Sequence, residues 1–410
     1  MRSAVSKAIQ EEDLKTVILI SGLNNNFLAP LSNYLPDALL PIANIPILHY
    51  TLSYLFSQNF QRIIIYALSS SQLIRKYVNT HYGKMKIEVQ NGRKSKSLGD
   101  VLRDLDANQS LRNLNDFVIM PVDLLLSTSL MDLFKRHLQR RNSINSCVMT
   151  FAFAKTPSDF FLQSDQIRGI RVKQPDSKLQ QFERYTVPKG NSKEINSFVE
   201  DLGLVLCSKH IPPLFQDNFD YKTFEDVIHG ILINEEIIQY TMHVEFLDPK
   251  TVHLRMACDI PRLFDTTRLL LERNLQPYYH VPPNYLSSQS YVLYNGMTNI
   301  YVSSKSKIHS SAKFHGSCII GDDTEIGSGA ILIDCVIGNN CSIGENVRLR
   351  RVVTMSDVTI CDNAKMNVAM IFSNAQILSR STFGKNVIVG PSLVLDEESV
   401  KIAKSNGCKL

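Results

Sequence analysis

The sequence contains no tryptophan, and its eight cysteines never form a C-x-x-C pair. The missing spacing argues against a structural zinc site and against the disulfide framework of a small secreted domain, so we expect no bound metal or other cofactor. No apolar run reaches the length of a membrane span. The first sixteen residues carry Glu11, Glu12 and Asp13 without a long apolar core, so no signal peptide is visible. We therefore expect a cytoplasmic protein, located in the cytosol, that binds no membrane.

Charge of one sign is not in large excess either. The chain has 44 Lys and Arg against 39 Asp and Glu, which gives a net charge of +5 with both signs mixed along its length. The basic clusters are short, and each is better explained as a solvated face than as a track for phosphates, so we expect no direct nucleic-acid contact. These clusters are Arg93 with Lys94 and Lys96, Arg140 with Arg141, and Arg348 with Arg350 and Arg351.

The first two thirds of the 410 residues alternate between two patterns. Short apolar runs, such as TVILIS at 16–21 and FVIMPVD at 117–123, predict buried strands. Helical patterns stand between them, so we expect β-α-β units with a parallel sheet and helices on both faces. This α/β domain is predicted over 16–280, after an N-terminal segment at 1–15. The predicted strands are 16–21, 62–68, 86–90, 117–123 and 147–153, and the predicted helices are 46–58, 70–82, 98–108 and 129–141.

The last quarter of the chain repeats every six residues, with three steps of five. Every position of this register is apolar, and five glycines each follow one of them. Such hexapeptide repeats are typical of a parallel β-helix, whose coils stack along one axis with these side chains inside. We predict the β-helix over 300–400, after a linker at 281–299 and before a tail at 401–410. The sixteen positions are Ile308, Phe314, Ile320, Ile326, Leu332, Ile337, Ile343, Leu349, Met355, Ile360, Met366, Phe372, Ile377, Phe383, Val389 and Leu395.

The first β-α turn is the usual phosphate-binding position in an α/β sheet of this kind. Here the turn at 22–27 (GLNNNF) has a single glycine, Gly22, and no Lys or Arg. Phosphate oxygens require a close approach of the backbone, which glycines permit, and a positive charge. The turn is therefore a poor nucleotide site.

The domain order resembles that of the sugar-phosphate nucleotidyltransferases, which join a Rossmann-like α/β domain to a left-handed β-helix. In those enzymes a P-K-P-L segment places a lysine against phosphate. The matching stretch here is PDALLPIAN at 36–44, and Asp37 stands in place of that lysine, where its charge would repel phosphate. Asp123 matches the metal-binding aspartate by position, although it could also cap the following helix or turn. We expect Gly22, Asp37 and Asp123 to form a degenerate nucleotide site without catalytic residues or metal.

A closer resemblance, over residues 17–400, is to the epsilon subunits of the eukaryotic translation initiation factor 2B complex, a non-enzymatic branch of the same family. Its most specific block is DNFDY at 217–221, where the gamma subunits match less well. The further blocks are Pro36 with LLP at 39–41 and AN at 43–44, HYTL at 49–52, SLGDVLRD at 97–104, 137–141, CVMT at 147–150, NEEI at 234–237 and NIY at 299–301.

This resemblance implies a subunit of the complex that exchanges GDP for GTP on the initiation factor 2 GTPase, acting in assembly and GTPase binding without chemical catalysis. It implies pairing with sister subunits, especially gamma. Asn218 and Phe219 match an Asn-Phe pair that contributes to contact with the GTPase. From the residues alone, Phe219 fits an interface hot spot and an aromatic packed under its loop equally well. Family members continue into a helical domain that carries the catalytic part of exchange, whereas this sequence stops at Leu410, so we expect little exchange by this chain alone.

Two other functions stay open at this point. A sugar-1-phosphate nucleotidyltransferase, for example one like mannose-1-phosphate guanylyltransferase, would use Asp123 and Asp259 to hold Mg²⁺ and the triphosphate. A hexapeptide acyltransferase would use a histidine of the β-helix as its general base. His309 and His315 each follow an inward position, so we expect both to face outward at the surface.

Overall fold

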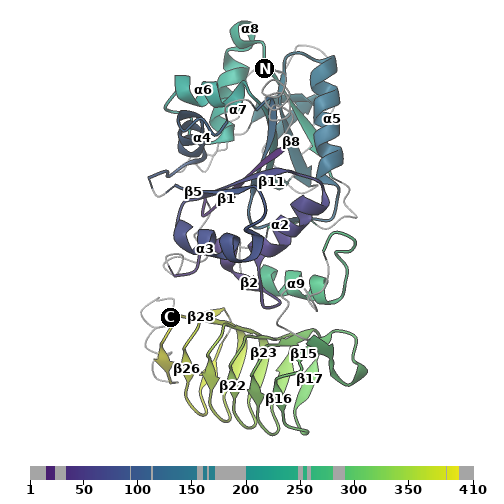
Figure 1. The fold of residues 1–410 in the computed structure, drawn as a ribbon, viewed down its shortest axis with the longest axis vertical. Coiled ribbons are helices and arrows are strands. Elements are labelled where there is room, and N and C mark those ends of the chain that lie inside the picture. Colours follow the sequence, from purple (N-terminus) through teal and green to yellow (C-terminus); the bar gives the residue numbers. More distant parts are fainter. Residues whose placement is uncertain are drawn as a thin grey trace, which may run out of the picture. The chain divides into compact units, whose positions relative to one another are not determined.

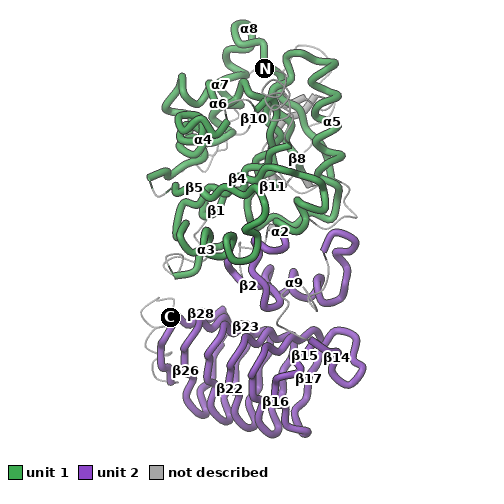
Figure 2. Tube along the Cα trace, in the orientation of Figure 1, with its two compact units in different colours: residues 1–26, 32–38, 51–255 green, residues 27–31, 39–50, 256–410 purple. Residues whose placement is uncertain are grey.

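The computed structural model describes residues 15–23, 34–92, 94–111, 114–154, 160–163, 166–170, 200–247, 253–255, 260–279, 291–384 and 386–396. The chain divides into two compact units (Figure 2). The second unit contains the β-helix, the residues from 256 that precede it, and the segment 39–50 from much earlier in the chain. The domain boundary near residue 280 stays a prediction, because compact units need not follow the order of the sequence. The first unit comprises 1–26, 32–38 and 51–255, and the second comprises 27–31, 39–50 and 256–410.

The first unit is built around a nine-stranded sheet with the order β5-β4-β1-β6-β11-β8-β12-β10-β9 (Figure 1). A separate two-stranded ladder joins β7 (Leu124–Leu126) to β13 (His253–Arg255). The strands of the large sheet are β1 (Thr16–Ser21), β4 (Arg62–Ala67), β5 (Ile87–Asn91), β6 (Asp116–Pro121), β8 (Cys147–Ala154), β9 (Phe160–Gln163), β10 (Gln166–Ile170), β11 (Glu200–Ser208) and β12 (Thr241–Phe246).

The sheet is mixed, whereas the sequence pattern predicted a parallel sheet. Strands β5, β4, β1 and β6 are parallel to one another, as predicted, and β12 is parallel to β8. Strand β11 is antiparallel to both β6 and β8, and β9 and β10 form a further antiparallel pair. Parallel pairing needs a crossover connection, usually a helix. Helices separate β1, β4, β5 and β6 along the chain, whereas only two residues separate β9 from β10.

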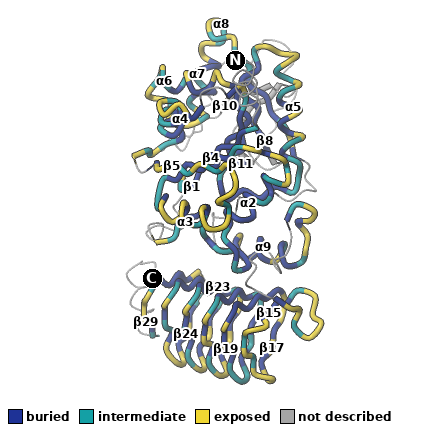
Figure 3. Tube along the Cα trace, viewed as in Figure 1, coloured by how far each residue is buried: buried dark blue, intermediate teal, exposed yellow. Residues whose placement is uncertain are grey.

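Helices cover both faces of this sheet. Ile18 and Ile20 of β1 pack into a core with buried residues of α4, α6 and α7. The alternate residues Val17 and Leu19 point to the opposite face and are also fully buried (Figure 3). The helices are α2 (Ile47–Ser57), α3 (Ser71–Tyr82), α4 (Leu98–Ala107), α5 (Leu130–Ser143), α6 (Ile211–Asp217), α7 (Phe224–Ile233) and α8 (Glu235–Ile238).

The second unit contains the predicted β-helix, in which three parallel ladders form the three faces of a prism (Figure 1). The first ladder contains β16 (Lys307–Ile308), β19 (Glu325–Ile326), β22 (Ser342–Ile343), β24 (Thr359–Ile360), β26 (Gln376–Ile377) and β29 (Val394–Leu395). The second contains β17 (Lys313–His315), β20 (Ile331–Ile333), β23 (Arg348–Thr354), β25 (Lys365–Ile371) and β27 (Thr382–Phe383). The third contains β15 (Ile300–Ser303), β18 (Cys318–Ile320), β21 (Val336–Ile337), the later parts of β23 and β25, and β28 (Val387–Val389).

Two of the sixteen predicted inward positions are one residue out of register. The third ladder aligns Thr354 with Ile371 and Ile371 with Val389, so these residues occupy the interior column. Met355 and Phe372, which were predicted there, are buried but lie outside the interior core. Thr354 appeared too polar for the interior, yet its hydroxyl accepts a hydrogen bond from the Gly338 amide at 3.1 Å. A buried hydroxyl with a partner carries little penalty, so hydrophobicity alone could not place the five-residue steps.

The β-helix shares its unit with a short hairpin and a helix. The hairpin joins β2 (Pro41–Ile42) to β3 (Ile45–Pro46), and its two turn residues both have positive φ. Asn44 at this turn donates a side-chain hydrogen bond to the carbonyl oxygen of Ile337 at 2.8 Å, so the hairpin is tied directly to a coil. Helix α9 (Ile260–Leu271) lies against β25. The segment 39–50 thus belongs by contact to the β-helix, although it precedes most of the sheet in sequence.

Candidate functional site

The predicted degenerate nucleotide site is assembled at the end of β1. Asp37 begins the short 3-10 helix at 37–39, and only 6% of its surface is exposed. Its carboxylate accepts hydrogen bonds from the amides of Gly22 and Ala38, both at 2.8 Å, and from the hydroxyl of Ser21. The Asp37 carboxyl group therefore occupies the Gly22 amide, a backbone donor at this turn.

The charges around Asp37 also disfavour a nucleotide. Burial raises the pKa of Asp37, the hydrogen bond from Ser21 lowers it, and the nearby Asp123 carboxylate raises it again. Asp123 follows β6 and is 4% exposed. The structure thus brings Gly22, Asp37 and Asp123 together, and their role as a degenerate nucleotide site stays a prediction. Asn24, Asn25, Asn26 and Asp259 lie outside the described residues.

The described part of the chain offers no group of three His, Cys, Asp or Glu side chains that could hold a metal ion. The two histidines considered for acyl transfer both lie at the surface. His309 is exposed and bonds through Nδ1 to the hydroxyl of Ser311 at 2.8 Å, and His315 is exposed on β17.

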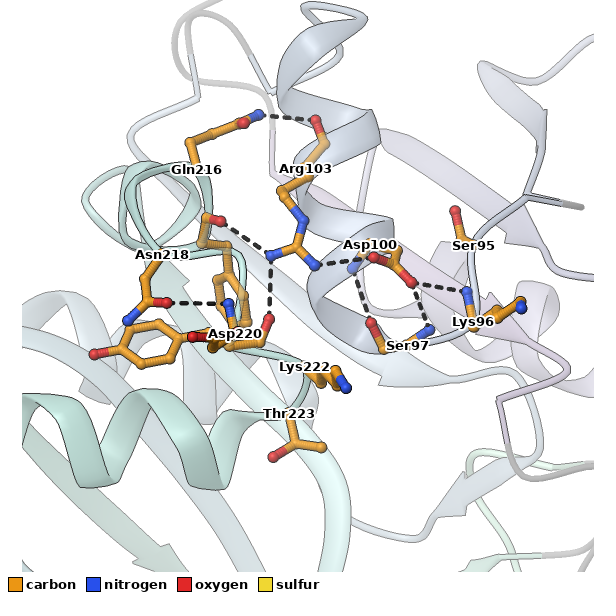
Figure 4. A network of polar contacts seen from close by, with 12 residues as sticks. Ser95, Lys96, Ser97, Asp100, Arg103, Gln216, Asn218, Asp220, Lys222 and Thr223 are labelled. Carbon is orange, nitrogen blue, oxygen red and sulfur yellow. Dashed lines mark hydrogen bonds and ion pairs between the residues drawn. The ribbon is translucent and has the colours of Figure 1, made fainter.

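A second candidate site is the loop between α6 and α7, which carries Asn218 and Phe219. Figure 4 shows Asn218 of this loop and the polar contacts of Arg103. Arg103 of α4 reaches into this loop from a distant part of the chain. Its guanidinium donates hydrogen bonds to the carbonyl oxygens of Phe215 at 3.0 Å and Tyr221 at 3.1 Å. These two carbonyls lie on either side of Asn218 and Phe219, so Arg103 holds both ends of the loop.

Asp100 orients the arginine. One of its carboxylate oxygens accepts from Arg103 at 2.9 Å, and the other accepts from the amides of Lys96 and Ser97 at the start of α4. Burial acts to raise the pKa of Asp100, but these hydrogen bonds outweigh it and lower the pKa to about 2. The carboxylate is therefore ionised at neutral pH, as its pairing with Arg103 requires.

Two glycines allow the loop to pack closely against its neighbours. A Cβ atom at Gly99 would collide with the carbonyl oxygen of Tyr221, and one at Gly230 would collide with the Tyr221 ring and hydroxyl. The Gly99 amide also donates to the carbonyl of Lys222 at 2.9 Å. The backbone of the loop is thus fixed to α4, and its tyrosine is fixed to α7.

Phe219 itself projects into solvent from this fixed base. Its side chain is 73% exposed, which is inconsistent with an aromatic packed under the loop. The Arg103 guanidinium lies over its ring at 5.4 Å from the centroid, an arrangement that favours a cation-π attraction. Asn218 accepts a hydrogen bond from the Asp220 amide at 3.0 Å and so shapes the turn. The contact of both residues with a GTPase stays a prediction.

The hydrogen bonds of Arg103 join two sequence blocks that were noted separately, SLGDVLRD at 97–104 and DNFDY at 217–221. Sequence reasoning singled out Asn218 and Phe219 but missed Arg103 as the residue that positions them. The only signal was that both blocks supported the same resemblance. Nothing in the local pattern of a helix identifies a partner more than one hundred residues away.

Comparison with known proteins agrees with this architecture. Residues 297–401 match the family described as the EIF2B subunit epsilon LbH domain, and residues 15–160 match the nucleotidyl transferase family. The translation initiation factor eIF2B subunit epsilon of Schizosaccharomyces pombe is 25% identical over 241 residues, which cover 54% of this chain and 35% of that protein. The protein of the same name from Dictyostelium discoideum is 26% identical over 335 residues, covering 77% of this chain and 45% of its own length.

The chain therefore spans less than half the length of these curated relatives. Among the described helices, none is long and apolar enough to cross a membrane. The two matched families occur in the order that the resemblance predicted, and the relatives carry the name that it predicted. The chain is thus similar to the eIF2B epsilon subunits, and it has a nucleotidyltransferase-like α/β domain followed by a left-handed β-helix like that of the eIF2B epsilon subunits.

Proposed function

We propose that this chain is a subunit of the guanine-nucleotide exchange complex for translation initiation factor 2, and that it acts in assembly and in binding the GTPase. The names of the two relatives support membership of the complex. In this proposal the chain works in the cytosol, pairs with sister subunits, especially gamma, and performs no chemical catalysis. Its former nucleotide site is degenerate and binds no cofactor.

The observation that carries the binding role is the exposed Phe219 on a rigid base. Large exposed aromatics that a protein holds in one conformation lose little entropy on binding and are frequent interface hot spots. Arg103 and Asp100 supply that rigidity here. A loop needed only to connect α6 and α7 would not require an aromatic side chain at its exposed tip.

The alternative, a sugar-1-phosphate nucleotidyltransferase, retains the support of the match at 15–160. Against it, the Asp37 carboxylate takes the Gly22 amide, and a second carboxylate lies nearby at Asp123. We therefore place the function in protein binding.

The test is a double substitution, Asn218→Ala with Phe219→Ala, in the full chain. We expect about a tenfold or greater loss of affinity for the initiation factor 2 GTPase, because truncation of a hot spot costs about 2 kcal/mol or more. The thermal midpoint should change little, since Phe219 is largely exposed. Affinity is measured by biolayer interferometry with the immobilised chain.

Tyr34→Ala provides the matched control, because Tyr34 is also an exposed aromatic, at 67%. It should leave GTPase affinity unchanged. Equal affinity of the double variant and the wild type would remove the site from the proposal. A tagged chain that copurifies with neither sister subunits nor initiation factor 2 from its native cell would remove the proposed function itself.

A further inference from the structure

One face of the β-helix carries an unusual arrangement of charge. We name it the basic face and define it by the outward side chains of the second ladder, which flank the interior residues of each strand. Strand pairing aligns these side chains in two columns that run along the helix axis. The first column contains Lys313, Ile331, Arg348, Lys365 and Thr382, and the second contains His315, Ile333, Arg350 and Asn367.

The basic face contains four cations and no acidic residue. Arg348 lies directly opposite Lys365 in the ladder, so two cationic residues are neighbours on adjacent coils, whose strands are about 4.8 Å apart. Such pairs destabilise a sheet. Arg350 projects from the same strand as Arg348, and both are exposed. The fold itself gains nothing from this concentration of positive charge.

The neighbouring acids do not neutralise these cations. Within the described residues, Lys313, Arg348, Arg350 and Lys365 have no carboxylate within ion-pair distance. This contrasts with the start of the β-helix, where Lys307 pairs with Glu325 at 2.6 Å and Lys305 pairs with Asp322 at 3.0 Å.

The acids at the corners of the prism serve the turns instead. Asp334 accepts a hydrogen bond from the Ser317 amide at 3.0 Å, and Asp362 accepts one from the Glu345 amide at 2.7 Å. Their carboxylates satisfy backbone donors where the chain changes direction. The positive charge of the basic face is therefore left for a partner.

Two isoleucines lie among the cations of the basic face and limit the classes of partner that would fit it. Ile331 and Ile333 lie side by side on β20, between the coil of Lys313 and the coil of Arg348. Both are partly exposed. A phosphate track has no use for an apolar pair at its centre, and the basic face offers no Phe, Tyr or Trp side chain on which a base could stack. An acidic polypeptide that also carries an apolar side chain fits both features.

We propose that the basic face binds an extended acidic segment of a partner protein, with carboxylates on Arg348, Arg350 and Lys365 and an apolar side chain on the Ile331–Ile333 pair. This surface lies on the β-helix and does not involve Asn218 or Phe219. The proposal therefore goes beyond the proposed GTPase contact and can fail or succeed independently of it.

The experiment measures fluorescence anisotropy of a labelled acidic peptide, about ten residues long, that alternates Glu with Leu at its centre. We expect the full chain to bind it and the Arg348→Ala, Arg350→Ala variant to bind about tenfold more weakly at low salt. The matched control is Lys305→Ala with Lys307→Ala, which removes the same net charge from cations that already have acidic partners. This control should retain the affinity of the wild type to within about twofold.

A second pair of measurements tests the apolar part. Ile331→Ser should lower the affinity for the Leu-containing peptide about threefold. The affinity for a peptide with Ser in place of Leu should not change. Equal losses in the two double variants would mean attraction by net charge alone and would overturn the proposal. Tighter binding of a thymidine oligonucleotide than of the acidic peptide would overturn it in favour of a nucleic-acid surface. Circular dichroism of each variant establishes that the β-helix remains folded.

Discussion

Individual corner residues of the β-helix reveal how the chain turns at each edge of the prism. Most corners use a left-handed residue, and Asn or Asp provides it at 323, 334, 340, 346, 357, 363, 374 and 386. These side chains tolerate positive φ better than other non-glycine residues. Val368 breaks this rule, because it is β-branched and has φ of 54°. A β-branched residue in this region is strained by roughly 1 kcal/mol or more.

Val368→Asn should therefore stabilise the β-helix. We expect a gain of about 1 kcal/mol and a rise in the thermal midpoint of about 2 °C, because Asn adopts the left-handed conformation at lower cost. Differential scanning calorimetry measures the shift. Val394→Asn serves as control, since Val394 is exposed on β29 without a positive φ, and it should give no increase. A fall in the midpoint for the Val368 variant would show that packing of the valine outweighs its backbone strain.

At the scale of elements, the first unit depends on contacts between segments that are remote in sequence. Helix α4 carries its own capping box at Ser97 and Asp100, a feature that the sequence pattern contains locally. The same Asp100 also orients Arg103, which then fixes the loop after α6. A single helix start thus supports both local helix formation and the geometry of the candidate binding loop.

Arg103→Met should loosen this loop more than it disturbs the helix. Two carbonyl oxygens lose a charged donor, so we expect the free energy of unfolding to fall by about 2 kcal/mol. Hydrogen exchange of the amides at 216–222 should accelerate. Arg103→Lys should recover little of the loss, because an ammonium group lacks the forked geometry that reaches both carbonyls and Asp100.

Arg136→Met is the control for loss of an arginine. Arg136 pairs with Glu245 at the surface, and Arg140 also pairs with that carboxylate. Its removal should cost less than about 1 kcal/mol and leave exchange at 216–222 unchanged. Unaltered exchange in the Arg103→Met variant would mean that the loop is held by packing of Tyr221 instead of by the arginine.

At the scale of the whole molecule, the chain matches two families, and its α/β domain has the architecture of a nucleotidyltransferase. At the first β-α turn of this domain, the Gly22 amide is bonded to the chain's own Asp37. We expect the carboxyl groups of Asp37 and Asp123 to oppose the binding of a triphosphate.

Nucleotide binding provides the corresponding prediction. Isothermal titration calorimetry with nucleoside triphosphates and Mg²⁺ should detect no binding in the micromolar range, because the Gly22 amide is already bonded to the Asp37 carboxyl group. Asp37→Asn, which removes the charge while preserving size, tests whether repulsion alone is responsible. Tight, Mg²⁺-dependent binding by the unaltered chain would instead support the sugar-1-phosphate nucleotidyltransferase.

The sequence by itself determined the β-helix and the parallel half of the sheet. In both, each structural unit is local: a hexad repeats along the chain, and a strand is followed directly by its crossover helix. The antiparallel pairs of the sheet were missed because their strands pair with partners that no local pattern specifies. The one-residue error at Met355 and Phe372 arose because a buried threonine hydroxyl found a backbone donor.

Only the tertiary structure decided how distant residues meet. Asp37 reaches Gly22 across fifteen positions, Arg103 reaches Phe215 and Tyr221 across more than one hundred, and Lys365 stands beside Arg348 because coils of fixed length stack in register. Side-chain chemistry can be read from a sequence, but the charge of a site is the sum over neighbours in space. The hydrogen bond between Gly22 and Asp37, the loop held by Arg103 and the basic face therefore became visible only once the chain was folded.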